Sequence, residues 1–125
     1  MKTFLISALL LSVVVAAPVF AHHGNAAFDV GKKLELKGTV TEWVWGNPHC
    51  WLKFDVKDAN GKVTNWVAET TNAADMTERG WSMRTFKAGD EVTVTLEPVK
   101  SGQPVGRVQS VLLANGKMLG LNYQR

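Results

Sequence analysis

The side chains that could bind a metal ion are concentrated at two places in this 125-residue chain. His22 and His23 are adjacent near the amino terminus, and His49 and Cys50 follow a Gly-Asn-Pro break at 46–48. They are all the histidines and the only cysteine of the sequence. Imidazole and thiolate are ligands that zinc and copper favour in proteins. A shared metal site would require a fold that brings the two places together.

Residues 1–21 have the layout of a secretory signal peptide. A positively charged start precedes the apolar run Phe4–Val15, and small residues around Pro18 lead to Ala21. The apolar run is shorter than the ~20 residues that a membrane-spanning helix needs. We therefore expect cleavage after Ala21, a periplasmic or secreted protein that begins at His22, and no membrane span after processing.

Composition limits what the mature chain can be. Its 104 residues carry 13 basic and 11 acidic side chains, because Lys2 is the only charged residue removed. The basic residues are scattered rather than gathered in a stripe, so we expect no nucleic-acid partner. A single cysteine excludes an internal disulfide, and burial as a small apolar residue is one ordinary fate for Cys50. The length suits one domain, which we place at 34–125 behind an arm at 22–33.

Alternating apolar residues predict a mainly β domain. One helix interrupts the strands at 73–79, with a capping residue at 70–72 before it and Gly80 as its stop. A bulge or sharp bend is expected at Gly38 in the first strand. The expected strands are 34–44, 51–56, 63–69, 91–97, 106–113 and 117–121.

This order of elements is that of a small OB-like β-barrel. Three strands, one short helix and two or three further strands give five or six in total, and the helix would close one end of the barrel. An open β-sandwich is the alternative for a chain so rich in strands.

Several short motifs are spread over nearly the whole mature chain. They are Ala21-His22-His23-Gly24, Ala26-Ala27-Phe28-Asp29, Gly38-Thr39-Val40, Asn47-Pro48-His49, Asn60-Gly61-Lys62-Val63, Arg79-Gly80-Trp81 and Gly89-Asp90-Glu91-Val92. On these motifs the chain resembles a family of small exported bacterial proteins of unassigned function. The resemblance implies an exported single domain and brings no activity with it. Cys50 departs from the alanine or aromatic residue expected after the Asn-Pro-His motif.

Cleavage before His22 would create a copper-binding group at the new amino terminus. The α-amine and the imidazole of one residue can close a chelate ring, and their unperturbed pKa values of about 8 and about 6.5 let both lose protons to a metal near neutral pH. Cu(II) binds nitrogen most tightly among divalent first-row ions and accepts three nitrogens in a plane. His49 would supply the third, in a ligand set of the histidine-brace type.

Other ligand sets use the same residues. His23 could bind copper through the terminal amine, an amide nitrogen and its own imidazole, which needs no fold. Zinc could be held by His22 or His23 together with His49 and Cys50. Cu(I) would favour Cys50 with a methionine. The histidines could also be incidental, in a frayed terminus and an ordinary loop.

Four tryptophans offer a competing, metal-free function. Trp43 and Trp45 are expected to face away from Val40 and Val44, where aromatic rings of an OB barrel can stack on sugars or bases. The four candidate residues are Trp43, Trp45, Trp51 and Trp66.

The sequence therefore predicts a periplasmic protein that carries or buffers a metal, copper first and zinc as the alternative. Its partner would be the metal ion and, in addition, another envelope protein. The alternative is a binding module that uses the tryptophan face for a glycan, peptide or protein, or a purely structural envelope protein. An enzyme is the least supported class, because no acid–base pair, phosphate-binding loop or nucleophile triad can be identified.

Overall fold

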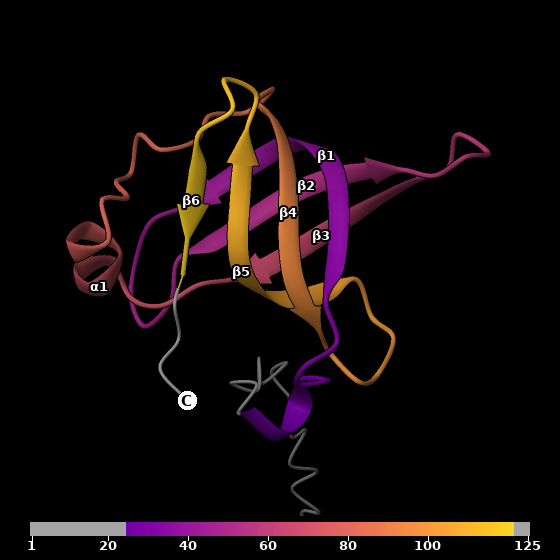
Figure 1. The fold of residues 1–125 in the computed structure, drawn as a ribbon, viewed down its shortest axis with the longest axis horizontal. Helices are drawn as coiled ribbons and strands as arrows, with labels where there is room; N and C mark the ends of the chain where they lie inside the picture. Colours follow the sequence, from indigo (N-terminus) through magenta and orange to yellow (C-terminus); the bar gives the residue numbers. More distant parts are fainter. Residues whose placement is uncertain (1–24, 122–125) are drawn as a thin grey trace, which may run out of the picture.

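Six strands and one short α-helix make up the part of the chain that the structure describes, residues 25–121 of a computed structural model (Figure 1). The predicted signal peptide, His22 and His23 lie outside the described residues. The elements are the 3-10 helix η1 (Asn25–Ala27), β1 (Leu34–Val44), β2 (Trp51–Lys57), β3 (Val63–Glu69), α1 (Ala73–Glu78), β4 (Glu91–Pro98), β5 (Val105–Leu113) and β6 (Met118–Gly120).

The first five strands close into a barrel. The sheet runs β3-β2-β1-β4-β5-β6 with antiparallel neighbours, and a parallel pairing of 67–69 in β3 with 105–107 in β5 joins its two sides. The short strand β6 pairs with the other end of β5, at 110–112. The predicted OB-like barrel of five or six strands with one short helix is thus confirmed.

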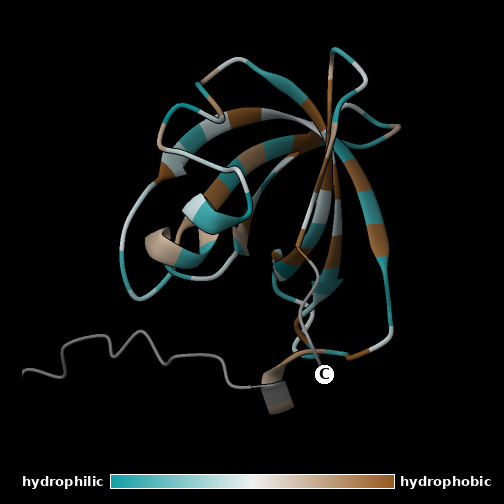
Figure 2. Ribbon diagram, turned by 60° about the vertical axis from the view of Figure 1, so that its left-hand side comes forward, coloured by the Kyte–Doolittle hydropathy of each residue, from teal (hydrophilic) through white to brown (hydrophobic). Residues whose placement is uncertain are grey.

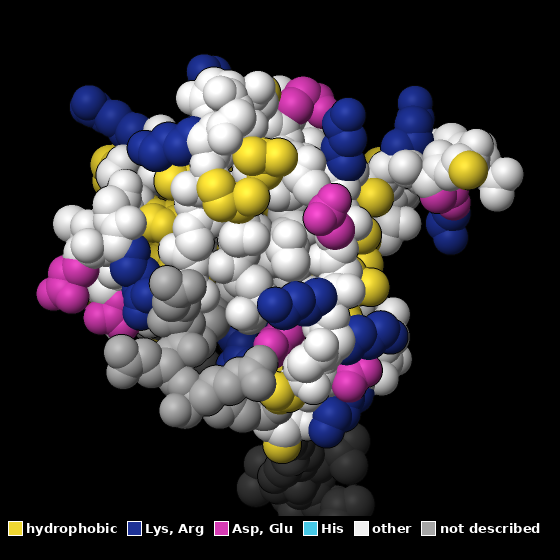
Figure 3. Space-filling view, viewed as in Figure 1, with side chains coloured by type: hydrophobic (Ala, Val, Ile, Leu, Met, Phe, Trp, Pro, Cys, Tyr) yellow, Lys and Arg dark blue, Asp and Glu magenta, His cyan; other side chains and the backbone are white. Residues whose placement is uncertain are grey.

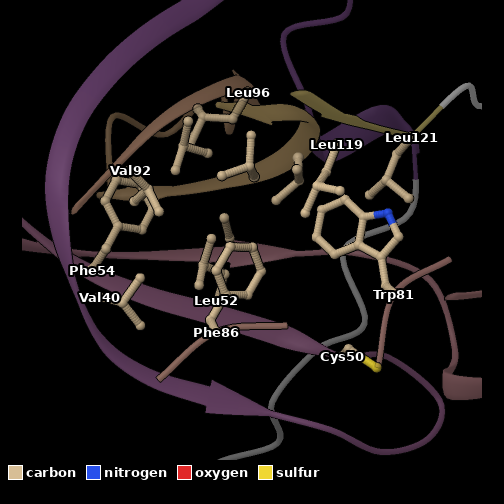
Figure 4. Packing of buried hydrophobic residues seen from close by; sticks show 14 of the residues in the cluster. Val40, Cys50, Leu52, Phe54, Trp81, Phe86, Val92, Leu96, Leu119 and Leu121 are labelled. Carbon is tan, nitrogen blue, oxygen red and sulfur yellow. The ribbon is translucent and has the colours of Figure 1, made fainter. Parts of the chain in front are cut away.

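Alternate residues of β2 and β4 fill the inside of this barrel. Leu52 and Phe54 of β2, and Val94 and Leu96 of β4, are fully buried, while the residues between them, Lys53 and Thr95, are more exposed. The hydropathy bands along the strands in Figure 2 follow this alternation. Figure 4 shows Leu52, Phe54 and Leu96 in one cluster, to which Val94 also belongs. Loops, α1 and β6 complete the core with Cys50, Met76, Trp81, Phe86, Leu119 and Leu121.

A β-bulge in the second half of β1 reverses its alternation. The register with β2 shifts between Val40 and Glu42, so that Thr41 is the extra residue. Trp43 consequently lies on the core side, like Val40, and packs against the core cluster. The prediction that Trp43 faces away from Val40 is therefore wrong, because the bulge falls at Thr41 and not at Gly38.

Gly38 instead marks the point where β1 changes its neighbour. Residues 34–39 pair with β4, and residues 39–44 pair with β2. A side chain at Gly38 would clash with the backbone oxygen of Asp55 and would approach the ring of Phe54 to 3.0 Å. The glycine thus allows β1 to pass close to β2 at the predicted bend.

The helix α1 begins and ends where the sequence predicts, to within one residue. The side chain of Asn72 caps it by accepting a hydrogen bond of 2.9 Å from the backbone nitrogen of Asp75. Met76 anchors it in the core, and Gly80 follows with a φ of +87°. Within residues 25–121 no helix has the length and apolar character needed to cross a membrane.

We expect Gly38→Ala to lower the free energy of unfolding by about 1–3 kcal/mol, because the added methyl group meets backbone that cannot move aside. Urea unfolding followed by tryptophan fluorescence would measure the change. Gly120→Ala in β6 is the matched control, since nothing lies within 4 Å of its added carbon, and we expect a change within about 0.5 kcal/mol. Equal stability of the two variants would contradict the close approach at Gly38.

Candidate functional site

A backbone carbonyl orients the ring of His49, which lies in the loop between β1 and β2. The ring nitrogen Nδ1 is 2.8 Å from the oxygen of Thr70. A carbonyl oxygen can only accept, so Nδ1 carries the proton and Nε2 of the neutral ring has its lone pair. The half-buried ring also contacts Trp51 edge to face, with centroids 5.9 Å apart. This is the tautomer and support that a histidine needs to bind a metal through Nε2.

The loop that carries this histidine is tied to the chain just before α1. The side-chain oxygen of Asn47 accepts a hydrogen bond of 3.2 Å from the backbone nitrogen of Ala73. The backbone nitrogen of Cys50 donates to Thr71 at 2.9 Å, and the oxygen of Cys50 accepts from the nitrogen of Thr70 at 2.9 Å. The Thr70 hydroxyl donates to the same oxygen at 3.0 Å. The loop is therefore held in place on both sides of His49, at Asn47 and at Cys50.

The thiol of Cys50 belongs to the core. The residue is 0% exposed, and its Sγ donates to the backbone oxygen of Gly46 at 3.6 Å. Figure 4 shows the sulfur at the edge of the buried cluster. Burial, one of the fates expected for a lone cysteine, is confirmed. To join His49 as a metal ligand, the thiol would have to leave this position.

Three charged side chains form a row across the outer surface of the barrel, which we call the charged row: Glu69, Arg107 and Glu97. In the strand registers Arg107 lies opposite both glutamates, and Trp51 lies opposite Glu69 at the end of the row. The Nη2 atom of Arg107 donates to Glu97 at 2.9 Å. Glu69 and Glu97 are only 6% and 2% exposed. These charges are largely withdrawn from water although they lie outside the barrel.

The chain segment before β1 covers part of this row. The ring of Phe28 lies against the guanidinium of Arg107, whose carbon is 4.7 Å from the ring centroid. Phe28 itself is 1% exposed. Backbone hydrogen bonds of 2.9 Å join Asp29 to Pro98 and Lys100 to Ala27. The described end of the arm is thus docked on the same outer surface that carries Trp51.

The four candidate tryptophans do not form one exposed face. Trp43, Trp45 and Trp66 pack against the core cluster and are half-buried. Trp43 and Trp45 lie 5.9 Å apart, and the indole nitrogen of Trp43 donates to the oxygen of Ser82 at 2.9 Å. Trp51 alone belongs to the outer surface, beside the ring of His49. On the face drawn in Figure 3, charged side chains of both signs are interspersed.

Residues 25–121 contain no group of three or more histidine, cysteine, aspartate or glutamate side chains placed to hold a metal ion. The predicted copper site therefore depends on His22 or His23, which lie outside the described residues. Of the predicted ligands, the described residues include His49 and Cys50. The charged row and Phe28 are features that sequence reasoning missed. No local pattern reveals them, because their members come from three strands and the arm.

Comparison with known proteins gives a family without an assigned activity. The family model described as "Family of unknown function (DUF6152)" matches residues 9–109, which is well over half of the chain. Comparison with curated proteins gave no match. The predicted resemblance to a family of unassigned function is confirmed at this level. Export and the functional meaning of the His-His-Gly and Asn-Pro-His motifs stay predictions.

We expect the Cys50 thiol to resist Ellman's reagent in the native protein, because the sulfur is fully buried. One equivalent should react once the chain is unfolded in urea, which serves as the control. The absorbance of the released thiolate measures both. Rapid reaction of one equivalent in the folded protein would show that the thiol is accessible and would restore Cys50 as an available ligand.

Proposed function

Since the chain belongs to the family of unknown function DUF6152, we propose its function from the site alone: an exported protein that binds copper through His22 and His49 and carries or buffers it in the periplasm. The ligands would be the α-amine and imidazole of His22 and the imidazole of His49. Three nitrogens of this kind suit Cu(II).

The observation that carries the proposal is the hydrogen bond between His49 and the Thr70 carbonyl. It selects the tautomer with a lone pair on Nε2, and such a second bond raises the basicity of a ligating imidazole. The loop that bears His49 is anchored by Asn47 and by the backbone of Cys50. A ligand held in this way loses little conformational freedom when the metal binds.

The processed amino terminus can reach His49. Phe28 lies against Arg107 on β5, and β5, β3 and β2 are consecutive neighbours around the barrel. With strands ~4.8 Å apart, about 10 Å separates Arg107 from the β2 position of Trp51. Six residues connect His22 to Phe28, and such a segment spans up to about 20 Å when extended. The described end of the arm therefore lies on the surface that carries Trp51, and the six residues from His22 to Phe28 are long enough to span the distance.

The burial of Cys50 supports copper over the zinc set that includes this thiol. A zinc site built from His49 and Cys50 would require the buried thiol to leave the core, which costs the burial of the sulfur and its bond to Gly46. The copper set needs no core residue. The metal-free alternative would rest on Trp51 with His49, because the other three tryptophans are engaged with the core.

The decisive experiment is a Cu(II) titration of chain that has been exported and processed to begin at His22, with the terminus verified by mass spectrometry. We expect one equivalent to bind tightly with a nitrogen-rich electron paramagnetic resonance spectrum. His49→Ala should weaken binding at least tenfold, because one of three nitrogens is lost. The same chain with one alanine added before His22 should lose the contribution of His49, because the α-amine is displaced, and any copper held by the new Ala-His-His terminus should bind equally well after His49→Ala.

The controls separate the alternatives. His23→Ala should leave the affinity nearly unchanged, whereas a local terminal chelate through His23 would be abolished by it and would survive His49→Ala. A Zn(II) titration of Cys50→Ala, compared with the native chain, tests the ligand set that contains the thiol. We expect the substitution to leave the zinc affinity unchanged. If the processed protein shows no tight copper binding, the proposal is wrong, and glycan or peptide binding at Trp51 becomes the function to test by fluorescence.

A further inference from the structure

We infer that Phe28 attaches the amino-terminal arm to the outer surface of the barrel by packing on Arg107 of the charged row. We call this contact the latch. By fixing the arm at Phe28, the latch would limit where the processed terminus can lie relative to His49. Its role toward the metal rests on the proposed function. The docking itself does not, and is tested without metal.

Phe28 is buried without belonging to the core inside the barrel. It is 1% exposed, yet it is not part of the hydrophobic cluster built from the strands, α1 and β6. Val30, two residues further on, is 52% exposed, and Phe28 is the buried side chain among the described arm residues 26–33. Because the Phe28 ring is buried outside the core, we assign to it the attachment of the arm to the barrel. Its removal should release the arm and leave the barrel intact.

The backbone next to Phe28 is tied to the turn between β4 and β5. Asp29 donates to Pro98, Lys100 donates to Ala27, and Phe28 forms an isolated antiparallel bridge with Val99. These contacts give the arm a defined direction as well as a position. Each bond alone contributes little, so the buried ring is needed to hold them together.

The charged row provides a stable base for the ring. The guanidinium of Arg107 is held by Glu97 at 2.9 Å, with side-chain exposures of 16% and 3%. The guanidinium carbon lies over the Phe28 ring, 4.7 Å from the ring centroid, and such a cation–π contact is strongest when water is excluded. Glu69, opposite Arg107 on β3, continues the row toward Trp51 and thus toward His49. The arm is therefore attached at Arg107, and in the proposed site the segment before Phe28 spans the distance from there to His49.

The docking is tested by amide hydrogen exchange of the metal-free protein. The amides of Asp29 and Lys100 should be protected in the native chain and should lose at least tenfold of that protection in Phe28→Ala, while barrel amides such as those of Leu52 and Val94 remain unchanged. Phe28→Leu, which keeps apolar bulk but not the aromatic ring, should lie between. Val30→Ala in the same segment is the matched control and should change nothing. Unchanged protection in Phe28→Ala would overturn the latch.

The role toward the metal is tested by a double-mutant cycle on copper affinity. In the native background, His49→Ala should weaken binding at least tenfold. In the Phe28→Ala background, it should matter less than twofold, because a released arm binds copper locally without His49. An equal effect of His49→Ala in both backgrounds would refute the positioning role. If the native protein binds no copper, the proposed function fails, and hydrogen exchange alone still decides whether the latch exists.

Discussion

The architecture depends on one short parallel pairing, between residues 67–69 of β3 and 105–107 of β5. Without it the strands would form an open sheet with two exposed edges. The pairing is possible because β5 passes close to β4 at Gly106, where a side chain would lie 2.6 Å from Leu96 Cδ1 and 2.8 Å from the oxygen of Glu97. Closure therefore places a residue without a side chain against the core and, next to it, Arg107 on the outer surface.

The buried charges beside this closure are better explained by their selection of one strand register than by a contribution to the free energy of unfolding. Removing an ion pair such as Glu97–Arg107 from water costs about as much as its attraction returns. Its position, however, distinguishes the native register from its neighbours, since a shift of β5 by one residue would turn Arg107 into the core. The same side chain then serves as the platform for Phe28. Arg107 thus takes part in barrel closure, in the strand register and in attachment of the arm.

The parts of the fold that were predictable from the sequence are those written in local patterns. Alternation at Leu52 and Phe54, the cap at Asn72 and the stop at Gly80 each involve residues a few positions apart, and the strands and helix follow from them. The bulge at Thr41 was not predictable, because an extra residue leaves no local mark when both faces carry large apolar side chains. The charged row was not predictable either, since strand pairing alone brings Glu69 and Arg107 together. His49 could be singled out as a rare residue type. Its tautomer was not predictable, because it depends on Thr70, which directly follows β3.

The strand β6 lies at an edge of the described sheet. It consists of only three residues, Met118–Gly120, and its neighbour in sequence, Leu121, is already buried in the core. A long, flat, apolar edge is a template on which further copies can add strands. Here the unpaired backbone is too short to hold another chain by hydrogen bonds alone, even though Leu112 and Met118 are exposed beside it. This edge of the barrel therefore offers few backbone hydrogen bonds to a second chain.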